Sequence, residues 1–297
     1  MGAFFSTFVR LAFVMVAIVA SAVPARAGII VSGTEQEHLD FAGDPMFQSV
    51  GWLLGVDSSG NEFIAGSGAS ISGQWGVTMA HVLDNGWSSL AFSLDPNARD
   101  LSAALYTIDS VYIHPGFVDD NGLGTSDDIA LFHLSVPIVG VTPAVIYTGA
   151  LTPGTHAYWS GYGALGYYPS GETDQYGMKM GGENMVDSIG STALGVDSQF
   201  FLADWGPAHS TPLLSLEMGG TNGDSGGGWF ADIDGQMQLI GLTAFSRGQF
   251  SNTGVIRPCV YQEWINETTA VPEPSSIFMI LSTFPMLWAV RRRRLFV

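Results

Sequence analysis

A serine set between glycines, in residues 223–227 (GDSGG), constrains the fold of this chain more than any other feature. A serine hydroxyl is a weak nucleophile until an imidazole takes its proton, and that imidazole needs a carboxylate to fix its tautomer. His81 and Asp128, each in an apolar and strand-like context, supply both groups upstream of Ser225. The fold must therefore bring together three side chains that follow one another in the order histidine, aspartate, serine.

This order excludes two other folds that use the same three groups. In α/β-hydrolases the serine comes first and the histidine last, whereas the last of the six histidines here, His209, precedes Ser225. A subtilisin-like order could use Asp40 or Asp44, but the sequence around them shows no parallel strands with crossover helices. Only the order histidine, aspartate, serine leaves each member in a strand-like context.

The central region has the pattern of an all-β protein. Short runs of Val, Ile and aromatic residues are separated by turn clusters such as 57–61 and 119–122. Only 12% of the residues are charged, 38 are glycine, and no long helical periodicity precedes Pro258. Short strands with many glycine turns are typical of barrels or sandwiches, so we expect an all-β fold with a short C-terminal helix.

Several motifs in register over residues 48–266 resemble the chymotrypsin/trypsin-like (S1-type) serine proteases. The segments that carry this resemblance are 63–83, 111–134, 161–163, 239–248 and 254–265. The resemblance implies two six-stranded Greek-key barrels, the first over about 28–140 and the second over about 141–268, joined by a linker near 137–143. It places the active site in the cleft between the barrels.

The resemblance also implies a role for each site residue. Ser225 would be the nucleophile, His81 the general base and Asp128 the group that orients the imidazole. The backbone N–H groups of Gly223 and Ser225 would form the oxyanion hole. Asp127 is the rival of Asp128, but the aspartate of the family directly precedes the Ile-Ala-Leu strand, which favours Asp128.

The same alignment of motifs predicts a substrate pocket that does not favour Lys or Arg. Gly219 lies six residues before the nucleophile, where trypsin-type members place an aspartate. Phe245 matches the aromatic wall, and Ser246 replaces a glycine that keeps the pocket open. Ala244 stands where the family has a serine that reaches the catalytic aspartate. We expect cleavage after small or medium apolar residues.

Activation and metal binding are left open by the residues themselves. Asp224 matches an aspartate that pairs with a newly freed amino terminus in the family, and residues 29–33 vaguely resemble that terminus, so a zymogen is one alternative. Acidic loops around Asp119, Asp120 and Asp127 are compatible with calcium, although no EF-hand spacing is present. We expect no cofactor and no metal. A protease-like binding or cell-envelope protein without activity is the alternative function.

The two ends of the chain read as targeting segments rather than parts of the fold. An apolar run follows Arg10 and leads to a small-x-small cleavage site, so residues 1–27 are predicted to be a signal peptide. Residues 269–297 combine Pro-Glu-Pro, an apolar run at 277–290 and an arginine cluster. This tail resembles the PEP-CTERM sorting signal of Gram-negative exporters, with an ordinary transmembrane tail anchor as the alternative. The predicted location is extracellular or in the cell envelope, with export machinery and a sorting enzyme as partners.

Charge and cysteine content limit the other partners. Residues 28–271 hold four basic and 26 acidic residues, a net charge of −22. Nucleic acid is therefore repelled, and protein or peptide substrates remain. The single cysteine, Cys259, cannot form an internal disulfide, so about 240 residues must be stabilised by core burial instead.

Overall fold

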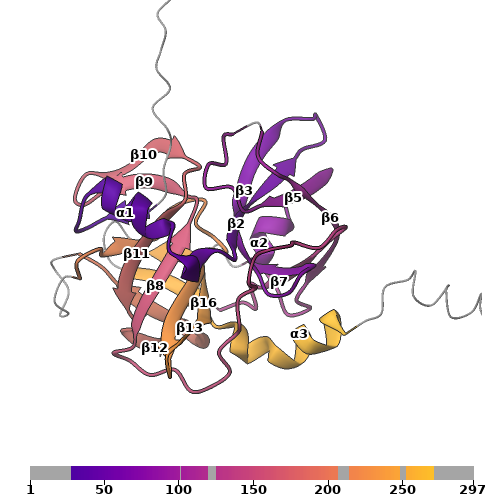
Figure 1. Ribbon diagram of the computed structural model, residues 1–297. Coiled ribbons are helices and arrows are strands. Elements are labelled where there is room, and N and C mark those ends of the chain that lie inside the picture. The colour runs from indigo at the N-terminus through magenta and orange to yellow at the C-terminus, as the bar shows by residue number, and fades with distance from the viewer. Residues whose placement is uncertain (1–27, 101, 120–124, 207–213, 248–251, 271–297) are drawn as a thin grey trace, which may run out of the picture.

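The computed structural model describes residues 28–100, 102–119, 125–206, 214–247 and 252–270, and it shows two groups of strands side by side (Figure 1). The first group is a closed six-stranded barrel in the order β2-β3-β4-β7-β6-β5. Its strands are β2 (Val50–Val56), β3 (Glu62–Ser70), β4 (Trp75–Thr78), β5 (Ser89–Ser93), β6 (Tyr106–Ile113) and β7 (Ala130–Leu134). The predicted first barrel is thus present.

The pairing of β4 with β7 places two of the expected site residues. The strands are antiparallel, and Thr78 lies opposite Ala130. His81 follows Thr78 by three residues and Asp128 precedes Ala130 by two, so both leave the barrel at the same end. A short helix, α2 (Ala80–Leu83), begins there and carries His81.

The second group contains more strands than the expected six. A seven-stranded antiparallel sheet has the order β11-β8-β15-β16-β17-β13-β12, and a four-stranded sheet has the order β10-β9-β1-β14. The bounds are β1 (Gly28–Ile30), β8 (His156–Gly161), β9 (Ala164–Tyr167), β10 (Gly171–Tyr176), β11 (Met180–Met185), β12 (Ser188–Ser191), β13 (Val196–Asp204), β14 (Met218–Gly219), β15 (Gly228–Ile233), β16 (Gln236–Arg247) and β17 (Asn252–Ile256). The all-β, chymotrypsin-like class is confirmed, but among the described residues the second group forms these two sheets rather than the expected six-stranded barrel, and the β9–β10 hairpin and β1 belong to the four-stranded one.

The N-terminal segment belongs to the second group rather than to the first barrel, where we expected it. β1 runs parallel to β9 and antiparallel to β14, so its backbone hydrogen bonds go to the second half. Helix α1 (Glu35–Ala42) follows and contacts β11. His38 of this helix is buried, and both of its ring nitrogens contact backbone carbonyls. Nδ1 lies 2.7 Å from the oxygen of Gly181, and Nε2 lies 2.8 Å from the oxygen of Ser32. The first barrel therefore begins at β2, after the short helix η1 (Pro45–Phe47).

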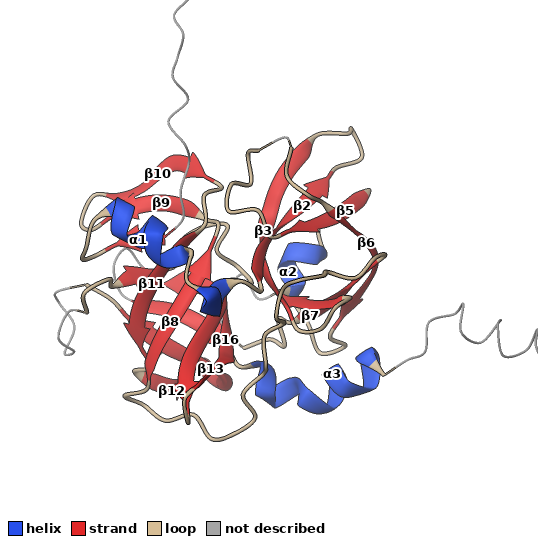
Figure 2. Cartoon of the chain, in the orientation of Figure 1, coloured by secondary structure: helices blue, strands red, loops and turns tan. Residues whose placement is uncertain are grey.

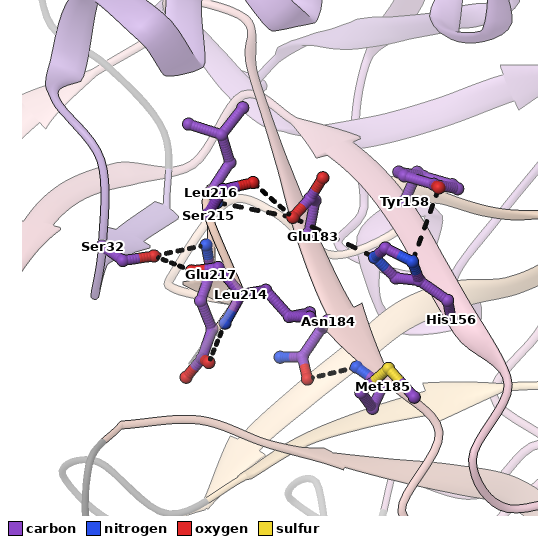
Figure 3. A network of polar contacts seen from close by, with 10 residues as sticks. All are labelled: Ser32, His156, Tyr158, Glu183, Asn184, Met185, Leu214, Ser215, Leu216 and Glu217. Atoms are coloured by element: carbon purple, nitrogen blue, oxygen red, sulfur yellow. Dashed lines mark hydrogen bonds and ion pairs between the residues drawn. The ribbon is translucent and has the colours of Figure 1, made fainter. Parts of the chain in front are cut away.

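A polar network fastens this N-terminal segment to the second half (Figure 3). The hydroxyl of Ser32 accepts the N–H of Glu217 at 2.8 Å and donates to the carbonyl of Leu214. Glu183 accepts the hydroxyl of Ser215 at 3.1 Å in the same network. Side chains and strand pairing thus hold residues 28–32 in place together.

The described part of the chain ends beneath the first barrel. After η2 (Pro258–Tyr261), helix α3 (Gln262–Thr269) lies below β7 in Figure 2. Tyr261 and Ile265 are buried in the same apolar cluster as the barrel residues Val77 and Leu131. The C-terminal helix expected from the sequence is therefore present, and it joins the last strand of the second half to the first barrel.

Among the described residues, no helix is both long and apolar enough to cross a membrane. The predicted signal peptide (1–27) and the apolar run at 277–290 lie outside the described residues. The predicted transmembrane helix falls in that run.

Candidate active site

His81, Asp128 and Ser225 form a continuous chain of hydrogen bonds. Nδ1 of His81 lies 2.7 Å from Oδ2 of Asp128, and Nε2 lies 2.9 Å from Oγ of Ser225. The backbone N–H of His81 donates to Oδ1 of Asp128 at 2.9 Å. Because the carboxylate can only accept, Nδ1 carries the proton and Nε2 is left to accept the serine hydroxyl. The side chain of His81 is 37% exposed and that of Asp128 is 14% exposed, so the pair lies at the edge of the cleft.

Asp127 faces away from this chain of hydrogen bonds. Its Oδ1 accepts the hydroxyl of Tyr261 at 3.0 Å, and its Oδ2 lies 3.5 Å from Nδ1 of His114. Burial and the neighbouring carboxylates of Asp127 and Asp128 raise the pKa of Tyr261, which therefore stays a hydrogen-bond donor. The two adjacent aspartates thus have different partners, and only Asp128 contacts His81.

The loop that carries Ser225 is fixed by backbone hydrogen bonds to both halves. Gly226 N–H donates to the carbonyl of Thr243 at 2.7 Å, and Thr243 N–H donates to that of Gly227 at 2.9 Å. From the first barrel, the N–H of Ser67 donates to the carbonyl of Ser225 at 2.8 Å. Within the part of the chain that the structure describes, the N–H groups of Gly223 and Ser225 have no protein acceptor. Both residues also line the cavity described below.

Asp224, between these two N–H groups, is fully buried. Its Oδ1 accepts the N–H of Gly163 at 2.8 Å, and its Oδ2 accepts the N–H of Thr221 at 2.9 Å. Burial raises the pKa of Asp224 to about 7, although these hydrogen bonds oppose the shift. The carboxyl group therefore anchors the loop from the side opposite the cleft.

A cavity of about 950 Å³ opens next to Ser225 and His81. Three of the four expected pocket residues line it, namely Ala244, Phe245 and Ser246. Ser246 Oγ donates to the carbonyl of Gly220 at 2.6 Å, which links the two walls of the pocket. The ring of Phe245 also packs on Phe200, with the ring centroids 5.6 Å apart. Phe245 therefore contributes to both the wall and the core.

Gly219, the fourth expected pocket residue, is not part of the cavity lining among the described residues. It lies against the indole of Trp205, which does line the cavity, and a Cβ atom at position 219 would come within 2.4 Å of Cε2 of that ring. No side chain fits at position 219, so an acidic group cannot occupy the place where a tryptic pocket would have one.

Sequence analysis missed several residues of this site. Trp205 lines the cavity, and no local motif marks it. Glu172 lines the cavity and accepts the side-chain amide of Asn222 at 3.0 Å. Ser67 contacts the nucleophile loop from the first barrel. All of these contacts join segments that are far apart in the chain, so spacing alone could not reveal them.

A comparison with protein-family models decides the relationship of the chain. Residues 43–265, three quarters of the sequence, match the family model described as Trypsin. The chain belongs to the trypsin family. It is therefore a serine-type endopeptidase, a hydrolase that acts on proteins or peptides. The resemblance seen in the sequence is confirmed for this trypsin-family domain, while the PEP-CTERM-like segment at 271–297 lies outside the described residues.

Proposed function

We propose that this protease cuts peptide bonds through an acyl-enzyme formed on Ser225. The hydrogen-bonded chain from Asp128 through His81 to Ser225, with distances of 2.7 and 2.9 Å, carries the proposal. A dyad of imidazole and hydroxyl in this geometry can transfer the serine proton at the moment of attack.

The reaction has two halves that use the same residues. Ser225 Oγ attacks the carbonyl carbon of the substrate while its proton moves to Nε2 of His81, and the C–N bond then breaks as that proton passes to the leaving amine. A water molecule next gives a proton to Nε2, attacks the acyl carbon and releases the acid, and the proton returns to Ser225. Asp128 stabilises the imidazolium in both halves.

The free N–H groups of Gly223 and Ser225 would bind the oxyanion that forms in each half. Donors aimed at the developing charge contribute most when they are fixed before the reaction begins. Backbone hydrogen bonds with Ser67 and Thr243 hold this loop, as do the N–H groups of Gly163 and Thr221 that donate to Asp224, and they support that role.

The pocket favours a small or medium apolar residue before the cut. A Lys or Arg side chain would meet Trp205 without a carboxylate partner at position 219, and burial of an unpaired charge is costly. The hydrogen bond from Ser246 to Gly220 crosses the pocket and limits its depth for large aromatic side chains.

We further propose that the enzyme is exported and that a sorting enzyme removes the tail. The apolar run before residue 27, the Pro-Glu-Pro motif and the arginine cluster support this location. Intact mass of the protein recovered from its host should show a chain that ends near 271–276, whereas a chain that keeps residues 291–294 would indicate a permanent anchor.

Labelling with a fluorophosphonate probe tests the central proposal. The probe phosphorus bonds to Oγ of an activated serine and fluoride leaves, so the purified wild type should be labelled at Ser225. Ser225→Ala should keep the fold but lose labelling, and it should lose activity by a factor on the order of 10⁶. Peptidase activity in Ser225→Ala equal to that of the wild type would refute the assignment.

A further inference from the structure

Ser67, on β3 of the first barrel, contacts the nucleophile loop through both its backbone and its side chain. Its N–H donates to the carbonyl of Ser225 at 2.8 Å, and its Oγ donates to the carbonyl of Gly223 at 3.1 Å. The same Oγ accepts the N–H of Tyr162 at 3.0 Å. One residue thus contacts both of the cavity-lining residues whose N–H groups have no acceptor within the described chain.

The hydroxyl of Ser67 both donates and accepts a hydrogen bond. A serine hydroxyl has one proton to donate, and Gly223 takes it, while the N–H of Tyr162 occupies a lone pair. Ser67 has no exposed surface, so water cannot replace these partners if the hydroxyl is removed. Loss of Oγ would leave the buried N–H of Tyr162 and the carbonyl of the half-buried Gly223 without these partners.

The contact also reaches the strand that leads to the histidine. Thr78 Oγ1 donates to the carbonyl of Ser67 at 2.7 Å, and Thr78 ends β4 three residues before His81. The hydrogen bonds therefore run from β4 to β3 and from β3 to the loop of Ser225. These hydrogen bonds therefore help to fix the distance between the segment that carries His81 and the loop that carries Ser225.

The position of these hydrogen bonds matters for the two free N–H groups. The peptide plane between Gly223 and Asp224 lies in the chain between the N–H of Gly223 and that of Ser225. Because Ser67 Oγ holds the oxygen of this plane, it limits rotation that would turn the two N–H groups apart. An oxyanion needs both donors at 2.7–3.1 Å, so a small rotation weakens its binding.

We propose that the hydroxyl of Ser67 is a positioning group for transition-state stabilisation in this protease, an inference that rests on the proposed role of Ser225. It acts through the Gly223 peptide and does not itself touch the substrate.

Ser67→Ala tests this role because it removes only Oγ and keeps the backbone N–H. We expect kcat to fall about tenfold with little change in KM, which is less than the 10²–10³ loss caused by deleting an oxyanion donor, because both donors are still present. The affinity for a peptide boronate, which forms a tetrahedral adduct with the serine, should fall by a similar factor. The affinity for the corresponding product peptide should not change.

Ser70→Ala is the matched control. Ser70 is a buried serine on the same strand, and its hydroxyl donates to the carbonyl of Ser72 at 2.8 Å, away from the loop. Both variants should lower the melting temperature, but only Ser67→Ala should lower kcat and boronate affinity. If Ser67→Ala does not fold, Ser67→Cys fills the site with a somewhat larger side chain and a much weaker donor and enters the same comparison.

Wild-type kcat and boronate affinity in Ser67→Ala would overturn the inference, and so would equal losses in the two variants. Failure of the proposed function looks different, since the wild type would then not be labelled by the fluorophosphonate and Ser225→Ala would be as active as the wild type. The wild type and Ser225→Ala should therefore be measured together with Ser67→Ala and Ser70→Ala.

Discussion

Lys179 should make the stability of this protein depend on pH in the neutral to alkaline range. The residue precedes β11 in the second half, and its Nζ donates to the carbonyls of Phe47 and Val50 at 2.7 and 2.8 Å. Only 6% of the residue is exposed. Two carbonyl acceptors match the two protons of a neutral amine, whereas an ammonium group has a third proton to place.

Burial lowers the pKa of Lys179 from 10.5 to about 7. The ring centroid of Tyr162 lies 6.0 Å from Nζ, at the outer limit of a cation–π interaction, so it offsets little of this effect. Each pKa unit corresponds to 1.36 kcal/mol, and the shift is therefore worth about 5 kcal/mol. Below pH 7 the folded protein bears this cost of a buried charge. Between pH 7 and 10.5 the unfolded chain binds more protons than the folded one, so stability rises with pH in this interval.

Lys179→Met should remove this pH dependence. The free energy of unfolding would be measured by urea titration from pH 7 to 9, in a Ser225→Ala background that prevents self-digestion. Relative to the variant, the protein with Lys179 should gain about 2–3 kcal/mol over these two pH units, since a single group contributes about 1.4 kcal/mol per unit. The contributions of all other titrating groups cancel in the difference. Parallel curves for the two proteins would show that Lys179 is not neutral in the folded state and would refute the reasoning.

Three further substitutions probe the pocket, the loop and the aspartate segment. Ser246→Gly removes the hydrogen bond across the pocket and should raise kcat/KM for substrates with Phe or Tyr before the cut, and a peptide library in which those substrates gain nothing would contradict the role of Ser246. Gly226→Ala should lower kcat/KM more than a hundredfold, because its Cβ would lie 2.0 Å from the carbonyl oxygen of Ser67 at a φ of +87°. Gly235→Ala is its control, with a similar φ of +81° and open space, and equal losses of activity would point to backbone strain instead. Tyr261→Phe removes a hydrogen bond to a carboxylate and should lower the free energy of unfolding in urea by about 1–2 kcal/mol, so an unchanged value would count against that bond.

The sequence predicts those parts of the site that depend on which residues stand next to a recognisable strand. His81 and Asp128 could be paired in advance because each adjoins a recognisable strand, and the register of β4 with β7 places them at one end of the barrel. The choice of Asp128 over Asp127 likewise follows from its place directly before the strand segment. The all-β class follows from the short apolar runs and glycine turns.

Other features depend on contacts between distant segments and left no local signal. Trp205, which follows β13, lies beside Gly219 of β14 although these strands belong to different sheets, and Ser67 meets the nucleophile loop only once the two halves dock. Helix α1 is different, since Thr34 and Glu37 form a capping box that could have revealed it. Its attachment to the second half could not have been predicted, because it depends on the contact of buried His38 with the carbonyl of Gly181 in β11.

The path of the chain makes the two halves interlocked. The described chain starts in the second half with β1 and α1, crosses to the first barrel, returns for β8 to β17 and ends with α3 beneath the first barrel. A single cut in the connection between β7 and β8 would therefore leave each fragment packed into both halves. A nicked molecule should keep its cleft and stay associated without any disulfide, so a protease exposed to its own activity would lose covalent continuity before it loses its active site.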